Sequence, residues 1–338
     1  MWPTDVSPTC RSLVVVLSFH GADDTLACVR SIMEGSSGHD VLVVDNGSFD
    51  GVLETVAAAW PHVATMQTGR NRGFSGGMNA GLARGLRDGY DVVTVLNNDT
   101  VVDPGALDEL LRTTAGSRVA ASPRVLYRDA PERAWFAGGL LDPDDGLPRH
   151  MTPAEAAAAG AEEGGEPYAV DILAGCSVTA SAATWRLVGP FDDRYFLNFE
   201  DSDWSMRARS LGVALQVAPR AVVRHGVSRS FTGAYAYLGT YYYLRNLLLF
   251  AATWLPARQR RRLLRTRVLP APVRDAREHG SRAGIRTGRL LADVAIARLL
   301  GRYGKAPDRI ERRAQRWSRR DLPVVAGEPT GFTPDGRA

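Results

Sequence analysis

Short apolar runs alternate with amphipathic segments through the first hundred residues. Residues 13–17 form a short β-branched run and residues 41–44 read as a buried strand, and we expect a third and a fourth strand at residues 63–67 and 91–96. Helical spacing of apolar positions follows the first three runs, and Gly35 is a typical helix stop. Asp103 and Pro104 predict a further helix, with Asp103 as its cap and Pro104 at its first position. We therefore expect an α/β fold: a Rossmann-like, mostly parallel sheet flanked by helices.

Polar residues follow each of the four predicted strands. They are Ser18 to His20, Asp45 and Asn46, Gly69 to Asn71, and Asn97 to Asp99. In parallel sheets the ligand crevice lies beyond the carboxyl ends of the strands. Four polar ends together favour a binding site over four unrelated turns.

The second half of the chain is less regular. Residues 140–167 are rich in Ala, Glu, Gly and Pro, which predicts a mobile loop or insertion with one short helix at 153–159. Strand-like runs at 170–173 and 213–217 resume the sheet. We expect residues 1–240 to form the main domain, residues 241–320 a basic helical segment, and residues 321–338 a disordered tail.

The net charge of +4 hides a strong asymmetry. Residues 241–320 hold 21 Arg and Lys residues against five acids, so this segment carries +16 and the rest of the chain −12. Cys10, Cys28 and Cys176 are odd in number and lack metal-ligand spacing, which favours a reducing, cytoplasmic setting over a disulfide framework. The first residues lack a charged region followed by an apolar core, so we expect no signal peptide.

Residues 241–255 are aromatic and apolar, and arginines follow at 258 and 260–262. Arg245 and Asn246 interrupt the apolar run, which is too short for a span of about 20 residues. Two interpretations stay open: residues 241–267 contact an anionic membrane surface, or they form a helical subdomain or a homo-oligomer contact. The arginines come without a recognition motif, so we expect no nucleic-acid partner.

The segment FLNFEDSDWSMRARSLG, residues 196–212, places three carboxylates within four positions. Helix capping, together with an i,i+4 pair to Arg207, is a sufficient account of Asp203. It does not explain Glu200 and Asp201, which directly follow the apolar residues of an aromatic run. A pair of carboxylates here is typical of a site that removes a proton from a hydroxyl near a bound cation.

Three other motifs carry candidate chemistry. Asp45 in VVDNGS suits either a hydrogen bond to a nucleotide or an Asx-turn, and the two interpretations are even. The glycines and arginines of GRNRGFSGGMNAG, residues 69–81, allow close backbone approach to a phosphate at a helix N-terminus. Asp99 in LNNDT suits a divalent cation that also contacts two phosphates. His225 after the VVR run is either a structural histidine or a ligand to metal or phosphate.

The strings VVDNGSFDG, NRGFSGGMNAGL, LNNDTVVDPGAL, LAGCSVTASAATWRLVGPFDDRYFLNFEDSDWSMRARSLG and VVRH occur in this order. In that order they resemble the family 2 inverting glycosyltransferases with a glycosyltransferase-A fold, especially the rhamnosyltransferase-like branch. The resemblance covers residues 12–226 and continues in YLRNLLLF, residues 243–250. Three positions differ from the usual residues of the family: Asn97 for Asp, Asn98 for Pro and His20 for Asn.

The resemblance implies a role for each matching residue. Asp201 would be the catalytic base, with Glu200 beside it, and Asp99 and His225 would hold Mg²⁺ or Mn²⁺. Gly175, Cys176 and Trp204 would lie on the acceptor side. The nucleotide sugar would be bound by the residues of the strand ends and the glycine-rich segment: Ser18, His20, Asp45, Asn46, Arg70, Asn71, Gly76, Asn97, Asn98 and Asp99.

The resemblance also implies the function. We expect residues 1–240 to form a glycosyltransferase-A catalytic domain that moves a sugar from a nucleotide-diphosphate donor to the hydroxyl of an acceptor. The first donor that we expect is dTDP-L-rhamnose, and the acceptor is a glycan or a lipid-linked molecule in bacterial cell-surface polysaccharide or glycolipid synthesis. The alternatives are a UDP-sugar transferase for another acceptor, a sugar-nucleotide nucleotidyltransferase, or a non-catalytic sugar-binding module. A nucleotidyltransferase is disfavoured because the segment SFHGADDT after the first strand is acidic. We expect the protein in the cytoplasm, with a peripheral position at the inner face of the cell membrane as an open alternative.

Overall fold

The computed structural model describes residues 10–115, 118–162, 164–226 and 236–318. The chain divides into two compact units. The first holds residues 1–140, 150–192 and 200–227, and the second holds residues 141–149, 193–199 and 228–338. Two short segments from within the predicted main domain thus belong with the C-terminal helices. The predicted tail at 321–338 lies outside the described residues.

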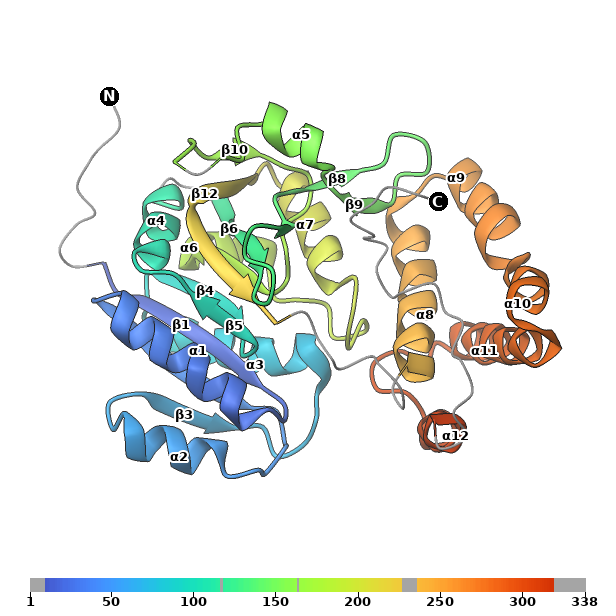
Figure 1. Cartoon of the computed structure of the whole chain (residues 1–338), viewed down its shortest axis with the longest axis horizontal. Helices are drawn as coiled ribbons and strands as arrows, with labels where there is room; N and C mark the ends of the chain where they lie inside the picture. The colour runs from blue at the N-terminus through green and yellow to red at the C-terminus, as the bar shows by residue number, and fades with distance from the viewer. Residues whose placement is uncertain (1–9, 116–117, 163, 227–235, 319–338) are drawn as a thin grey trace. The chain divides into compact units, whose positions relative to one another are not determined.

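The first unit is built on a ten-stranded sheet with the order β10-β12-β6-β11-β4-β1-β2-β3 (Figure 1). Strands β1 (Ser12–Ser18), β2 (His39–Asp45), β3 (Ala64–Gln67) and β4 (Val92–Asn97) run parallel, which confirms the four predicted strands. Strand β11 (Ser177–Ser181) runs antiparallel to both of its neighbours, β4 and β6. The other strands of the sheet are β5 (Thr100–Val102), β6 (Val119–Tyr127), β7 (Ala134–Phe136), β10 (Tyr168–Ala169) and β12 (Ala214–His225).

Helices cover both faces of this sheet. Alternate residues of β1 point to opposite faces and pack in two different hydrophobic clusters. Val14 and Val16 of β1 pack in a cluster with α1 (Ala22–Gly35), α2 (Val52–Ala59) and α4 (Ala106–Thr113). Val15 and Leu17 pack in the opposite cluster with α3 (Gly73–Arg87), α6 (Ala182–Val188) and α7 (Glu200–Ser210). Burial on both faces explains why β1 reads as a continuous apolar run.

The start of α4 differs from the prediction. The helix begins at Ala106 after Gly105, which has a φ of 77° and gives no side-chain cap. Pro104 therefore precedes the helix, and Asp103 does not cap it. The carboxylate of Asp103 instead accepts two hydrogen bonds from Arg224, of 2.8 and 2.9 Å. This bidentate pair ties the segment before α4 to β12.

The predicted insertion contains more regular structure than we expected. Strands β8 (Gly139–Leu141) and β9 (Pro148–His150) form a small two-stranded sheet. Helix α5 (Pro153–Ala158) confirms the predicted short helix and begins with a capping box between Thr152 and Glu155.

The second unit is helical. Its elements are α8 (Ala236–Trp254), α9 (Ala257–Leu263), the π-helical turn η3 (Leu264–Val268), α10 (Ala271–His279), α11 (Ser281–Leu299) and α12 (Asp308–Ser318). Aromatic residues of α8, among them Tyr241 and Tyr242, pack with Leu290, Val294 and Ile310. The aromatic stretch that we considered for membrane contact is thus the core of this unit. Among the described residues, no helix has the length and apolar character needed to cross a bilayer.

Candidate active site at the carboxyl edge of the sheet

The polar strand ends of the parallel sheet lie side by side. The register pairs Ser18 at the end of β1 with Asp45 of β2, and Leu17 with Asn97 of β4. Asp45 in turn pairs with Gln67 at the end of β3. Parallel pairing without a register shift therefore brings all four predicted polar ends to one edge.

Asp45 holds the turn after β2. Its side chain is 1% exposed and accepts hydrogen bonds from the Ser48 N–H at 2.9 Å, the Phe49 N–H at 3.1 Å, the Gln67 amide at 2.6 Å and the Ser48 hydroxyl. Burial opposes ionisation, yet these hydrogen bonds keep the pKa of Asp45 below its ordinary value. The geometry is that of an Asx-turn, and a contact with the nucleotide stays a prediction.

Asn46 ties the loop after β2 to the loop before α3. Its amide donates to the Gly73 carbonyl at 2.9 Å, and its carbonyl accepts from the Arg72 N–H at 3.1 Å. A Cβ at Gly47 would lie 2.5 Å from the backbone of Arg70, so only glycine allows these loops to approach each other. Asn46 is buried, whereas Arg70 is exposed and Asn71 is half-buried at the start of α3.

The glycines of α3 serve helix packing. A Cβ at Gly77 would lie 2.6 Å from Leu17, one at Gly81 would lie 2.3 Å from Val15, and one at Gly85 would lie 2.7 Å from Leu13. The four-residue spacing of these glycines puts them on one face of α3, against the sheet. Gly76 is buried within the same helix. Close contact between helix and sheet therefore accounts for Gly77 and Gly81 of the glycine-rich segment, and a phosphate contact of this segment stays a prediction.

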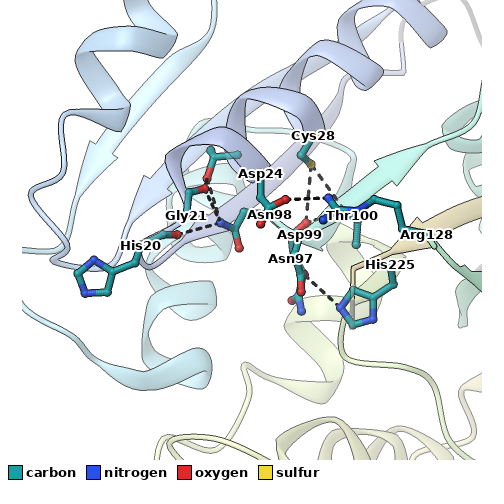
Figure 2. Close-up of polar contacts among 11 residues, drawn as sticks. His20, Gly21, Asp24, Cys28, Asn97, Asn98, Asp99, Thr100, Arg128 and His225 are labelled. Atoms are coloured by element: carbon teal, nitrogen blue, oxygen red, sulfur yellow. Dashed lines mark hydrogen bonds and ion pairs between the residues drawn. The ribbon is translucent and has the colours of Figure 1, made fainter. Parts of the chain in front are cut away.

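The end of β4 is bound to the start of α1 (Figure 2). The Asn98 amide donates to the Thr25 hydroxyl at 2.9 Å and to the His20 carbonyl at 3.2 Å. The buried Ser18 hydroxyl shares a 2.9 Å hydrogen bond with the same Thr25 hydroxyl. His20 is exposed and has a φ of 60°, a conformation that favours Asn, Asp and His among non-glycine residues.

Asp99 and His225 face each other directly. His225 Nε2 lies 3.1 Å from Asp99 Oδ1, and Figure 2 shows the contact between the two side chains. Burial opposes ionisation of Asp99, but the hydrogen bond and charge of His225 and the charge of Arg128 hold its pKa below the ordinary value. The ring of Trp135 packs edge-on against His225 with a centroid distance of 4.7 Å. We did not predict Trp135, which comes from the short strand β7 and matches no motif.

The Asp99–His225 pair suits a divalent cation that a phosphate group also binds. Mg²⁺ and Mn²⁺ commonly use one or two protein carboxylates and complete their shell with phosphate oxygens and water. Among the described residues, no group of three or more His, Cys, Asp or Glu side chains could hold an ion. His225 Nε2 is the nitrogen that contacts Asp99, whereas Nδ1 is buried with no hydrogen-bond partner among the described residues.

Glu200 and Asp201 open helix α7 in different environments. Asp201 is half-buried, and its carboxylate accepts from the Gly175 N–H at 3.0 Å and the Ser202 N–H at 2.6 Å. Burial raises the pKa of Asp201, and these hydrogen bonds oppose the rise. Glu200 is buried, and its Oε2 has no hydrogen-bond partner among the described residues. Burial and the neighbouring Asp201 raise the pKa of Glu200 well above its ordinary value.

Gly175 and Cys176 connect the two acidic clusters. The Gly175 N–H binds Asp201, and the Cys176 carbonyl accepts a 2.9 Å hydrogen bond from the Asn97 N–H at the end of β4. The Cys176 thiol is buried, which raises its pKa well above the ordinary range, and the charges of both Asp99 and Asp201 raise it further. Two adjacent residues before β11 thus bring the predicted cation pair and the predicted base to one edge of the sheet.

Asp203 and Trp204 stabilise α7. The Asp203 carboxylate accepts from Arg207 Nε at 2.9 Å, which confirms the predicted i,i+4 pair. Trp204 is 0% exposed and donates to the Gly189 carbonyl at 2.9 Å, with its ring 4.7 Å from that of Trp185. This placement corrects our expectation that Trp204 lines the acceptor side, because its indole has no exposed surface.

Two curated relatives are enzymes of lipid-linked sugar synthesis. N-acetylglucosaminyl-diphospho-decaprenol L-rhamnosyltransferase of Mycobacterium tuberculosis (strain CDC 1551 / Oshkosh) is 29% identical over 207 residues, which cover 56% of this chain and 67% of that protein. Polyprenol monophosphomannose synthase of Mycolicibacterium smegmatis is 31% identical over 129 residues, which cover 37% of this chain and 49% of that protein.

Two solved structures share the fold. GalNAc-T7 with UDP, GalNAc and Mn²⁺ has a TM-score of 0.58 at 15% identity, and the match covers 84% of this chain and 55% of that one. The mannosyltransferase PcManGT of Pyrobaculum calidifontis, in complex with GDP-Man and Mn²⁺, has a TM-score of 0.51 at 16% identity, and the match covers 88% and 90%. The model of the glycosyl transferase family 2 matches residues 13–151 of this chain. Residues 13–151 of this chain therefore match the glycosyl transferase family 2, and the described residues have a glycosyltransferase-A type of fold.

Proposed function

We propose that this protein moves a sugar, with inversion, from a nucleotide-diphosphate donor to the hydroxyl of a lipid-linked glycan acceptor. The observation that carries the proposal is the link through Gly175 and Cys176. It holds the Asp201 carboxylate and the β4 end that bears Asp99 at the same edge of the sheet. A displacement at an anomeric carbon needs a base on the acceptor side and charge stabilisation on the leaving-group side.

Asp201 is the base in this mechanism. The N–H groups of Gly175 and Ser202 fix its carboxylate by hydrogen bonds. The residue is half-buried, so part of its surface stays accessible to an acceptor hydroxyl. The proton of the acceptor hydroxyl passes to Asp201 as that oxygen attacks, and the nucleoside diphosphate departs from the opposite face of the sugar. A raised pKa makes the carboxylate a better proton acceptor near neutral pH, and general-base help is typically worth about 10²–10⁴-fold.

Asp99 and His225 are the residues that would hold Mg²⁺ or Mn²⁺, which offsets the charge of a departing diphosphate. The lowered pKa of Asp99 keeps this carboxylate ionised at neutral pH, as a cation ligand must be. The two structural relatives contain Mn²⁺ with their nucleotides, which supports a cation in this reaction.

The M. tuberculosis relative supports dTDP-L-rhamnose as the first donor to test and a polyprenyl-diphosphate sugar as the first acceptor. A UDP-sugar is the second candidate donor, because GalNAc-T7 holds UDP in its solved structure. Bacterial cell-wall polysaccharide synthesis is the process that this donor and acceptor would serve.

The test is Asp201→Asn, with Asp108→Asn as its control. Asp108 is an exposed partner of His39 at the amino end of β2, so its loss leaves the strand ends intact. We expect Asp201→Asn to lose about 10²-fold or more in turnover and to keep nucleotide affinity within about twofold. Binding is measured by calorimetry with dTDP-L-rhamnose, UDP-sugars and GDP-mannose, with and without Mn²⁺. Wild-type turnover of Asp201→Asn would refute the assignment.

A further inference from the structure

The helices of the second unit display an unusual number of exposed apolar side chains. Eleven large apolar side chains are exposed among the described residues, and seven of them lie within residues 264–300. They are Leu264, Leu269, Val273, Ile285, Ile296, Leu299 and Leu300. Single exposed apolar residues are ordinary, but a concentration of them in one segment marks an interaction surface.

Helix α11 shows how these side chains are arranged. Its buried positions Ala283, Thr287, Leu290, Val294 and Ala297 face the core of the unit. A second stripe at alternating steps of three and four residues is exposed along its whole length: Arg282, Ile285, Arg289, Ala292, Ile296 and Leu299. Leu299 is 85% exposed. Because i,i+3 and i,i+4 positions share one face, α11 carries an outward stripe of apolar residues with arginines among them.

The charge of the same segment is almost entirely positive. Residues 257–300 contain twelve arginines and only three acids, Asp275, Glu278 and Asp293. Asp275 is buried and accepts a hydrogen bond from Thr287, and Asp293 is buried and paired with Arg313. Glu278 is therefore the one exposed acid in this segment, all of which the structure describes.

We propose that α9, η3, α10 and α11 form a surface that rests on an anionic lipid bilayer. This inference rests on the proposed function, in which the acceptor is lipid-linked. Exposed leucine and isoleucine side chains among arginines fit an interface of headgroups and acyl chains, where both kinds of side chain gain free energy. A nucleic-acid backbone would attract the arginines but give the apolar stripe nothing to bury against. A second copy of the chain would bring a segment of net charge +9 against itself.

The proposed surface overlaps the predicted contact, residues 241–267, only from residue 257 onward and excludes the aromatic stretch before it. Tyr241, Tyr242 and Phe250 of the predicted stretch are at most 2% exposed, so they cannot enter a bilayer while the unit is folded. The exposed apolar residues begin at Leu264, beyond the aromatic run.

The test is flotation of the full chain with vesicles of phosphatidylcholine alone and of phosphatidylcholine with phosphatidylglycerol. We expect binding to the anionic vesicles that weakens as salt is added, and little binding to the neutral ones. The triple variant Ile285→Ser/Ile296→Ser/Leu299→Ser should bind at least about tenfold more weakly with an unchanged melting temperature, because all three side chains are exposed. Leu211→Ser, at an exposed apolar position on the first unit, should bind like the wild type.

Three outcomes decide against the proposal. Equal binding to both kinds of vesicle, or full binding by the triple variant, overturns it, as does a preference for a double-stranded oligonucleotide over anionic vesicles. The assay needs no turnover, so a protein that floats but transfers no sugar would refute the proposed function and leave this surface standing. A triple variant that keeps turnover on a water-soluble acceptor analogue shows that the surface acts on lipid contact alone.

Discussion

Replacing Asn246 with alanine should release a strained segment that leads directly into the acidic pair. Phe196, Asn198 and Phe199 have φ angles of 62°, 69° and 71°, and the chain passes from Phe199 into Glu200. Left-handed backbone costs an L-residue about 1–2 kcal/mol but is readily adopted by Asn, so Phe196 and Phe199 together store about 2–4 kcal/mol of strain. The rest of the second unit must offset that cost.

Asn246 and Arg245 supply the opposing contacts from α8. The buried Asn246 amide donates to the carbonyls of Tyr195 at 2.6 Å, Leu197 at 2.7 Å and Asn198 at 3.0 Å. Arg245 also donates to the Tyr195 carbonyl, at 3.0 Å. Arg245 and Asn246, the two polar residues that interrupt the apolar run, therefore hold the backbone of residues 195–198 by hydrogen bonds. We call this pair of side chains the clamp.

The expected magnitude follows from which carbonyls lose their donor. In Asn246→Ala the Tyr195 carbonyl keeps Arg245, whereas those of Leu197 and Asn198 lose the Asn246 amide. An unsatisfied buried acceptor costs about 1–3 kcal/mol, and these two are only part-buried, so about 1 kcal/mol each is appropriate. We expect a loss of about 2–3 kcal/mol in unfolding free energy, and a fall in kcat with little change in the donor KM.

Urea unfolding and steady-state kinetics measure both parts of the prediction. The matched control is Thr253→Ala on the same helix, whose exposed hydroxyl bonds only to the carbonyl one turn earlier, so its unfolding free energy should change by less than about 0.5 kcal/mol. Hydrogen exchange at residues 196–200 should quicken in Asn246→Ala and not in the control. Unchanged stability and exchange in Asn246→Ala would contradict the clamp, and lost stability with an unchanged kcat would contradict its link to the acidic pair.

Three further results are expected. Gly81→Ala should cost about 1–3 kcal/mol of stability in thermal melts, because its Cβ would lie 2.3 Å from Val15, whereas Gly288→Ala, with open space around it in α11, should stabilise by about 0.5–1 kcal/mol. The raised pKa of Glu200 means that the fold binds its proton more tightly than the unfolded chain does, so unfolding free energy falls as pH rises above about 4. Glu200→Gln should remove this fall, and melting temperatures of both proteins from pH 4 to 8 measure it. The same change in melting temperature with pH in both proteins would contradict the idea. His225→Ala should raise the Mn²⁺ concentration for half-maximal turnover by about tenfold, or about 1.4 kcal/mol, and an unchanged titration would exclude His225 as a ligand.

The parallel half of the fold could be predicted because its signals are local. Strands buried on both faces appear as continuous apolar runs, and each is followed by a helix with its own periodicity. The position of β11 between β4 and β6 could not be predicted in the same way, because antiparallel insertion depends on pairing between segments about 60 to 90 residues apart. The assignment of residues 193–199 to the second unit depends on hydrogen bonds from Arg245 and Asn246, which no local pattern announces.

The contacts of a candidate site residue could be predicted where its sequence pattern has a single physical explanation. Asp203 and Arg207 pair as their spacing indicates, and Asp99 meets His225. The sequence could not separate two physical causes that produce the same pattern of residues. Glycines suit both a phosphate loop and a helix packed closely on a sheet, and the contacts of Gly81 show the second cause. A tryptophan beside an acidic pair suits an acceptor surface or a core, and Trp204 lies in the core.

The acidic pair that dominates the sequence is better understood as two carboxyl groups with different protonation. Both have raised pKa values, but Glu200 is buried with an unsatisfied oxygen, whereas Asp201 accepts hydrogen bonds from Gly175 and Ser202. Hydrogen bonds to the charged form favour ionisation, so Asp201 is the more easily ionised of the two. When the environments of two neighbouring acids give them different pKa values, that difference indicates which acid serves as the base. The raised pKa of Glu200 disfavours a second charge beside Asp201, which suits the proposed role of Asp201 as the base.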